Sequence, residues 1–105
     1  MKKIVLLGIC LASSLTFAAG QDTDACNELA DLAAAVMQQR QDGVPLETQE
    51  RIALEFEDES KALYEEIVQA SYEQPIYRTD LVKQQSVEKI RKQYFELCMA
   101  AEKVH

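Results

Sequence analysis

The sequence contains no tryptophan, a single histidine, two prolines and three glycines among its 105 residues. One histidine and no paired cysteine motif exclude most metal and haem chemistry. A chain of this length forms one domain at most and has no room for a separate cofactor-binding half. Apolar residues make up 48% and charged residues 28%, which is an ordinary globular balance rather than that of a disordered chain. We therefore expect one globular domain and no cofactor.

Basic residues are also scarce, since 11 Lys and Arg stand against 18 Asp and Glu, a formal net charge of −7. This sign argues against nucleic acid or an anionic membrane as the main partner. The charge is uneven along the chain. Residues 22–73 hold 14 acidic and 3 basic side chains, whereas residues 74–105 hold 4 and 6. The last part of the chain is therefore expected to pack against an acidic surface formed by the earlier part.

The first twenty residues have the order of a secretory signal peptide. Residues 1–3 give a short positive start, residues 4–12 are an apolar run, and residues 13–20 shift toward small side chains. Cleavage is expected after Ala18, and a cut after Gly20 is the alternative. We predict a signal peptide at 1–18, a helical domain at 19–105, and export to the periplasm or the medium.

Two other readings of this segment are less consistent with its sequence. The run from Ile4 to Ala19 contains only 16 residues, which is short of the roughly 20 that a spanning helix needs. Lipidation at Cys10 would require a small residue where Ile9 stands. We therefore expect no membrane association after cleavage.

Cleavage changes the charge and cysteine counts. It removes two lysines and no acidic residue, so 9 basic residues face 18 acidic ones and the net charge becomes −9. Cys26 and Cys98 are the cysteines that remain. An even pair in an exported chain implies a disulfide, and the absence of a C-x-x-C motif favours a structural bond over a redox pair.

The mature chain shows no strict alternation of apolar and polar residues, whereas the helical period recurs throughout. Gly43 can take a left-handed cap, Pro75 interrupts the pattern, and Thr79 is a good N-cap. The polar run at 57–60 is expected to be a turn. The predicted helices cover residues 24–41, 46–56, 59–73 and 80–102, with one unbroken helix over 46–73 as the alternative.

Each predicted helix carries an apolar stripe that is expected to be buried. The stripes comprise Cys26, Leu29, Ala30, Ala33, Val36 and Met37; Ile52, Ala53 and Phe56; Leu63, Tyr64, Ile67, Val68 and Ser71; and Val87, Ile90, Tyr94, Leu97, Cys98 and Ala101. Short loops between such helices predict a small antiparallel bundle of three to four helices. In that topology Cys26 and Cys98 lie at the same end, which fits the expected disulfide.

Candidate chemistry along the chain is sparse. Met37 and His105 would lie at opposite ends of an antiparallel bundle, so they are not expected to hold haem. The acidic run at 55–59 lacks the glycine turn and distal glutamate of a calcium loop, so no metal site is expected. No Ser, Thr or Cys stands in a nucleophile motif. These absences predict a protein that is not an enzyme.

Several segments resemble a known group of exported proteins. They are Ala25-Cys26-Asn27-Glu28, residues 36–44, residues 70–79 and the late Cys98. This pattern is similar to an uncharacterised family of small exported helical proteins with a cysteine pair from Gram-negative bacteria. The resemblance implies a helical fold and a periplasmic location, and it implies no active site.

The leading hypothesis is an exported interaction protein that binds a basic protein, as inhibitors or immunity proteins do. The candidate surface combines an acidic run with tyrosines that flank Pro75. Its residues are Glu55, Glu57, Asp58, Glu59, Tyr72 and Tyr77. The alternative is a periplasmic stress chaperone that exposes apolar surface when acid protonates its carboxylates.

Overall fold

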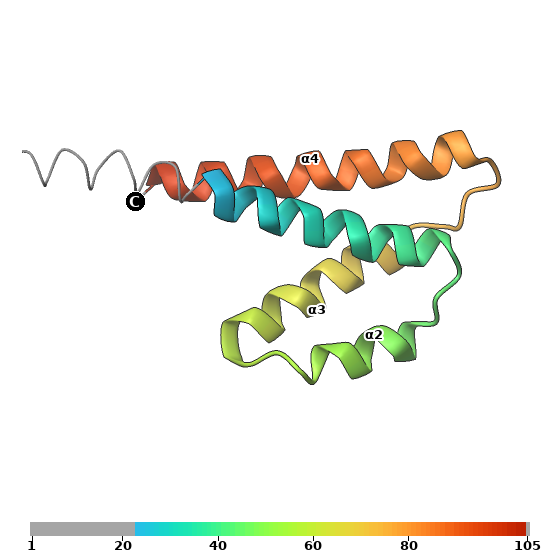
Figure 1. Cartoon of the computed structure of the whole chain (residues 1–105), viewed down its shortest axis with the longest axis horizontal. Helices are drawn as coiled ribbons and strands as arrows, with labels where there is room; N and C mark the ends of the chain where they lie inside the picture. Colours follow the sequence, from blue (N-terminus) through green and yellow to red (C-terminus); the bar gives the residue numbers. More distant parts are fainter. Residues whose placement is uncertain (1–22, 105) are drawn as a thin grey trace, which may run out of the picture.

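The computed structural model describes residues 23–104, with side chains through residue 102. These residues form four α-helices and no strand: the first helix (23–41), α2 (Leu46–Ala53), α3 (Asp58–Tyr72) and α4 (Asp80–Val104). Successive helices run in opposite directions (Figure 1). The predicted small antiparallel all-α bundle is confirmed. The predicted signal peptide, both cleavage positions and His105 lie outside the described residues.

The first helix ends as its sequence predicts. Gly43 has a φ of 87° in the left-handed region, which glycine adopts without a steric cost. The Gly43 amide donates to the Arg40 carbonyl at 3.0 Å, and the Val44 amide donates to the Gln39 carbonyl at 2.9 Å. These bonds satisfy carbonyls that the helix end leaves without partners. In the loop before α4, the Thr79 side chain accepts a hydrogen bond from the Val82 amide at 3.2 Å, so its predicted role as N-cap of α4 is confirmed.

The helices α2 and α3 are separate, but α2 ends at Ala53, three residues before the predicted boundary. The turn occupies residues 54–57 rather than the predicted 57–60. The chain reverses early, and this reversal brings the Phe56 ring onto Tyr64 with 4.8 Å between ring centroids. Asp58 completes the reversal with a φ of 51°, a conformation that aspartate tolerates better than most residues.

All four helices contribute to one hydrophobic core. In the first helix Ala30, Ala33 and Ala34 are at most 3% exposed, and their small side chains allow close approach of the neighbouring helices. Larger side chains fill the space between them. The core cluster contains Ala33, Ala34, Val36, Met37, Ala53, Tyr64, Ile67, Val68, Val87, Ile90 and Tyr94. The predicted stripes therefore identify most of the core.

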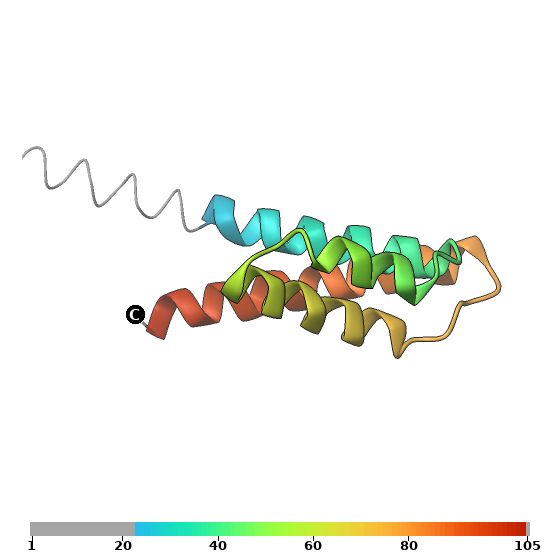
Figure 2. The same ribbon diagram turned by 90° about the horizontal axis from the view of Figure 1, so that it is seen from below.

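Three residues of the predicted stripes are exposed instead. Leu63 is 37% exposed, Leu97 is 63% exposed, and Ala101 also faces solvent. Figure 1 shows why this end of the molecule is open, since the α2–α3 hairpin diverges from the other two helices toward its turn. The last turns of α4 also extend beyond the hairpin (Figure 2), so the hairpin does not cover them. The sequence period gives the direction of a stripe, but it does not say how far a neighbouring helix extends.

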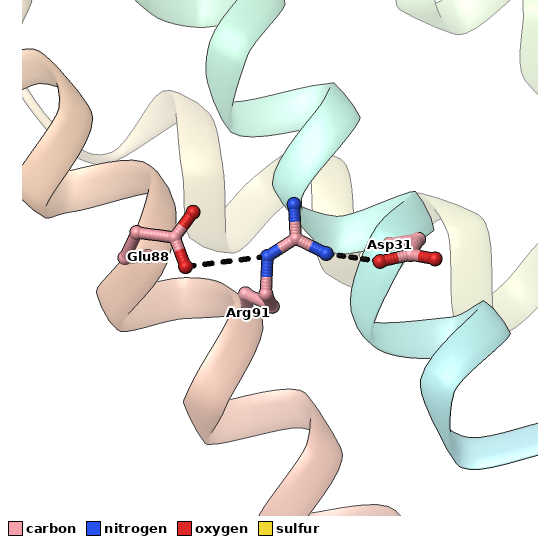
Figure 3. Close-up of polar contacts among 3 residues, drawn as sticks. All are labelled: Asp31, Glu88 and Arg91. Carbon is pink, nitrogen blue, oxygen red and sulfur yellow. Dashed lines mark hydrogen bonds and ion pairs between the residues drawn. The ribbon is translucent and has the colours of Figure 1, made fainter.

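The first helix and α4 form an antiparallel pair, called here the long pair. The predicted disulfide is confirmed: Cys26 and Cys98 are bonded, with 5.5 Å between their Cα atoms and a sequence separation of 72. Arg91 of α4 forms an ion pair with Asp31 of the first helix (Figure 3). It also contacts Glu88 of its own helix at 3.4 Å. Exposed ion pairs of this kind contribute little, so the disulfide is the main link at this end.

Candidate functional site

The acidic half of the predicted surface lies at the turn between α2 and α3. Glu55 and Glu57 belong to the turn, and Asp58 and Glu59 begin α3. All four side chains are exposed. None of them has a cationic partner among the described residues. The turn is therefore an uncompensated negative surface.

The tyrosines of the predicted surface lie at the opposite end of α3. Tyr72 is the last residue of this 15-residue helix, and a rise of about 1.5 Å per residue places it roughly 20 Å from the acidic turn. Tyr77 lies farther along, in the loop to α4. The structure therefore does not bring the carboxylates and the tyrosines together as one continuous surface.

The loop between α3 and α4 is fixed by side chains of the first helix. Gln41, which is 1% exposed, donates to the Pro75 carbonyl and accepts from the Tyr77 amide, each at 2.9 Å. Arg40 donates to the Gln74 carbonyl at 2.9 Å. These bonds satisfy backbone groups that the loop would otherwise leave without partners. Tyr77 is half-buried in this loop.

A groove of about 440 Å³ lies between α2 and α3. The spacing of its residues places them on one face of each helix. From α2 it is lined by Leu46, Gln49, Glu50 and Ala53. From α3 and the residue after it, the lining residues are Glu65, Val68, Gln69, Tyr72 and Glu73. A volume of this order is within the range of ligand-binding clefts.

The base of this groove is a buried polar cluster centred on Gln49, which is fully buried. Its amide oxygen accepts from the Tyr64 hydroxyl, and its amide nitrogen donates to Gln39 and, at 3.3 Å, to the Tyr72 hydroxyl. Tyr72 in turn donates to the Val44 carbonyl at 2.7 Å. Burial, and secondarily Tyr72, raises the pKa of Tyr64 above its ordinary value near 10. The Tyr64 hydroxyl therefore stays protonated at neutral pH and can donate to Gln49.

The carboxylates of the groove stand at its edge. Glu50, Glu65 and Glu73, called here the rim carboxylates, are all exposed and have no cationic partner among the described residues. No basic residue lines the groove. The Arg40 guanidinium lies over the Tyr72 ring, 5.2 Å from its centre, and so covers one face of it. The groove thus combines an apolar interior with a negative edge.

Among the residues of this groove, the sequence predicts a binding role for Tyr72 alone. A signal was present, because Leu46, Gln49, Glu50 and Ala53 follow the i, i+3, i+4, i+7 spacing of one helix face. Gln49 was missed because glutamine is usually exposed. Its burial depends on Gln39 and Tyr64, which lie 10 and 15 positions away.

A second groove, of about 340 Å³, lies between α3 and α4. Its walls include apolar side chains such as Met37, Val82 and Ile90. Its charged residues have opposite signs, since Glu73 and Lys89 both line it. This groove therefore has no preference for a ligand of either charge.

Within residues 23–104, no group of three or more His, Cys, Asp or Glu side chains is arranged to hold a metal ion. None of the helices described there is long and apolar enough to cross a membrane. The scan against protein-family models finds no match, and the searches of curated proteins and of solved structures find none either.

Proposed function

We propose that the protein is a small exported interaction protein, without enzymatic activity, that binds a basic protein partner as an inhibitor or immunity protein would. One observation carries this proposal. Every acidic side chain from Asp24 to Glu73 is exposed, and among the described residues only Asp31 of these forms an ion pair. The negative charge of this half of the molecule is therefore not neutralised internally.

An uncompensated charge of this kind favours a partner of the opposite sign. It attracts a basic surface over several ångströms and raises the rate of encounter, and salt weakens the attraction. Export of the chain is supported by its disulfide, because such bonds persist in oxidising compartments. The signal-like start of the sequence is consistent with the same destination.

The contacts that hold the hairpin favour this proposal over an acid-activated chaperone. Opening the bundle by acid would require carboxylates in those contacts. Gln49 of the hairpin is bonded to Gln39 of the first helix and to Tyr64 and Tyr72. Gln41 of the first helix holds the loop that follows the hairpin, through the Pro75 carbonyl. Amides and phenols do not titrate between neutral pH and the acid range.

The test uses the full chain, exported from a Gram-negative host and purified through a C-terminal tag with its disulfide intact. Proteins retained from a periplasmic extract are identified by intact mass, and the binding of a purified basic candidate is measured at low and high salt. We expect a stoichiometric basic partner whose association rate falls with salt.

Charge reversal provides the matched test of the acidic turn. The variant Glu55→Lys/Glu57→Lys/Glu59→Lys is expected to slow association several-fold with a smaller effect on dissociation. Salt-insensitive binding, or a rate unchanged by these three substitutions, would contradict the proposal. Dye binding and client protection that rise as the pH falls to 3 would instead support the chaperone.

A further inference from the structure

We propose that the groove between α2 and α3 is the docking site for a cationic amphipathic segment of the partner. An apolar side chain of that segment would enter the groove, and flanking Lys or Arg side chains would meet the rim carboxylates Glu50, Glu65 and Glu73. This inference rests on the proposed function and assigns the contact to a surface other than the acidic turn.

The interior of the groove is suited to an apolar group. Ala53 and Val68 contribute side chains that are 2% and 6% exposed, and the Tyr72 ring forms part of the wall. At the mouth, Leu46 is 43% exposed and available for contact. The polar atoms beneath are already paired, because the Gln49 amide is bonded to three side chains. A ligand therefore needs no polar group to enter, and burial of an apolar one is favourable.

The edge of the groove favours a positive charge on the side chains that flank the apolar residue of the docking segment. The three rim carboxylates come from both sides of the groove, one from α2 and two from α3 and its end. They are exposed and lack cationic partners in the described residues. An acidic segment would be repelled, whereas Lys and Arg side chains could lay their aliphatic stems along the apolar wall and place their charges at the rim.

The two acidic surfaces would then have different roles in the same complex. The turn carries charge but little apolar wall, so it acts mainly on encounter. The groove offers buried contact area as well as charge, so it acts mainly on dissociation. This division separates the present proposal from the general attraction of opposite charges.

The probe is a short synthetic helical peptide with Leu at every third or fourth position and Lys between them, carrying a fluorophore. Anisotropy gives its affinity for the full, disulfide-bonded chain, and amide chemical shifts locate the contact. We expect the largest shifts at Glu50, Ala53 and Val68. A peptide with Ser in place of Leu keeps the charge and tests the apolar contribution.

Two variants of equal charge test the site. Glu50→Gln/Glu65→Gln/Glu73→Gln neutralises the rim carboxylates, and Glu28→Gln/Glu47→Gln/Glu66→Gln neutralises exposed carboxylates that lie outside both the groove and the acidic turn. The rim variant is expected to bind roughly tenfold more weakly. The control variant should lose no more than about twofold. All six positions are exposed, so unchanged thermal unfolding will show that both variants are folded.

A second matched pair tests the apolar contact. Leu46→Ser alters the mouth of the groove, whereas Leu54→Ser alters an exposed leucine, 72% accessible, that does not line it. We expect faster dissociation of the Leu/Lys peptide only for Leu46→Ser. Equal effects of the two substitutions would overturn the apolar part of the proposal.

The remaining outcomes distinguish this inference from the proposed function. Equal weakening by the rim and control variants, equal binding of the Ser/Lys peptide, or shifts confined to the acidic turn would overturn the groove as docking site while a basic partner could still be captured. If neither a basic protein nor the Leu/Lys peptide binds the wild-type chain at low salt, the proposed function fails as well.

Discussion

The long pair and the α2–α3 hairpin are both antiparallel helix pairs, but different chemistry holds them. The long pair extends beyond the rest of the bundle, where Leu97 is exposed and the Cys26–Cys98 bond joins the helices covalently. The hairpin has no covalent link. Its helices meet over the Phe56–Tyr64 stack and the fully buried Gln49.

The two regions also differ in charge. The hairpin from Leu46 to Glu73 carries nine acidic and two basic side chains, whereas the two helices of the long pair together carry seven acidic and six basic ones. The near-neutral pair is fixed by a bond that salt does not affect. The acidic pair is held by neutral hydrogen bonds that leave its carboxylates free for a partner. Stability and surface charge are thus assigned to separate parts of a small chain.

The largest effect is expected when the covalent link of the long pair is removed. The Cys26→Ala/Cys98→Ala variant should lose about 4 kcal/mol of unfolding free energy, the loop-closure value for a bridge across some 70 residues. Urea unfolding of this variant and of the reduced wild type measures the loss. Hydrogen exchange should show that α4 beyond Tyr94 opens first. A loss below about 1 kcal/mol would mean that packing alone holds that end.

The next effect concerns the polar cluster of the hairpin. Gln49→Ala removes the partner of the Tyr64 hydroxyl and leaves a cavity, so we expect a loss of about 2–3 kcal/mol in chemical denaturation. Arg51→Ala, an exposed change in the same helix, should stay within about 0.5 kcal/mol. If Gln49→Ala were equally mild, the cluster would not be what holds the hairpin.

A smaller effect of opposite sign is expected inside α3. Ser71 is fully buried, and its hydroxyl has no hydrogen-bond partner among the described residues. Ser71→Ala should therefore raise the unfolding free energy by about 1 kcal/mol. The matched control is Ser86→Ala, since the Ser86 hydroxyl donates to the Lys83 carbonyl at 2.6 Å. Stabilisation by the control as well would remove the role of the unpaired hydroxyl.

The smallest effect is a change in unfolding free energy that develops only at alkaline pH. Burial raises the pKa of Tyr64 in the hairpin, and burial with the Glu66 charge raises that of Tyr94 in α4. The folded state then holds these protons more tightly than the unfolded state. The stabilisation is complete below the ordinary pKa near 10 and is lost as the pH rises through the raised values. Alkaline unfolding of Tyr64→Phe and Tyr94→Phe, each compared with wild type, assigns the share of each region.

Much of the long pair is predictable from the sequence. Its apolar spacing, the glycine at position 43, the Thr79 cap and the two cysteines all act locally or through simple topology. The exposure of Leu97 and Ala101 is the exception, because it depends on how the hairpin diverges from α4. A periodic stripe contains no information about the length of its neighbour.

The hairpin is less predictable for the same physical reason. Its turn contains neither glycine nor proline, so nothing local indicates that α2 ends at Ala53. The Phe56–Tyr64 stack fixes that end, and it forms only after the chain has reversed. The groove was missed because Gln49 is buried by partners from two other segments. The carboxylates of the turn could be identified directly, since they stand in one run.

The bond between Cys26 and Cys98 also determines how the fold responds to mechanical load. A force applied at any point before residue 26 and any point after residue 98 passes through the sulfur atoms and bypasses the chain between the two cysteines, which includes α2, α3 and most of the first helix and α4. The bundle cannot be pulled apart from those two directions until the bond is reduced, whatever its equilibrium stability. An unfoldase that engages the chain before Cys26 or after Cys98 would likewise reach the disulfide-closed loop after only a few positions of the described chain.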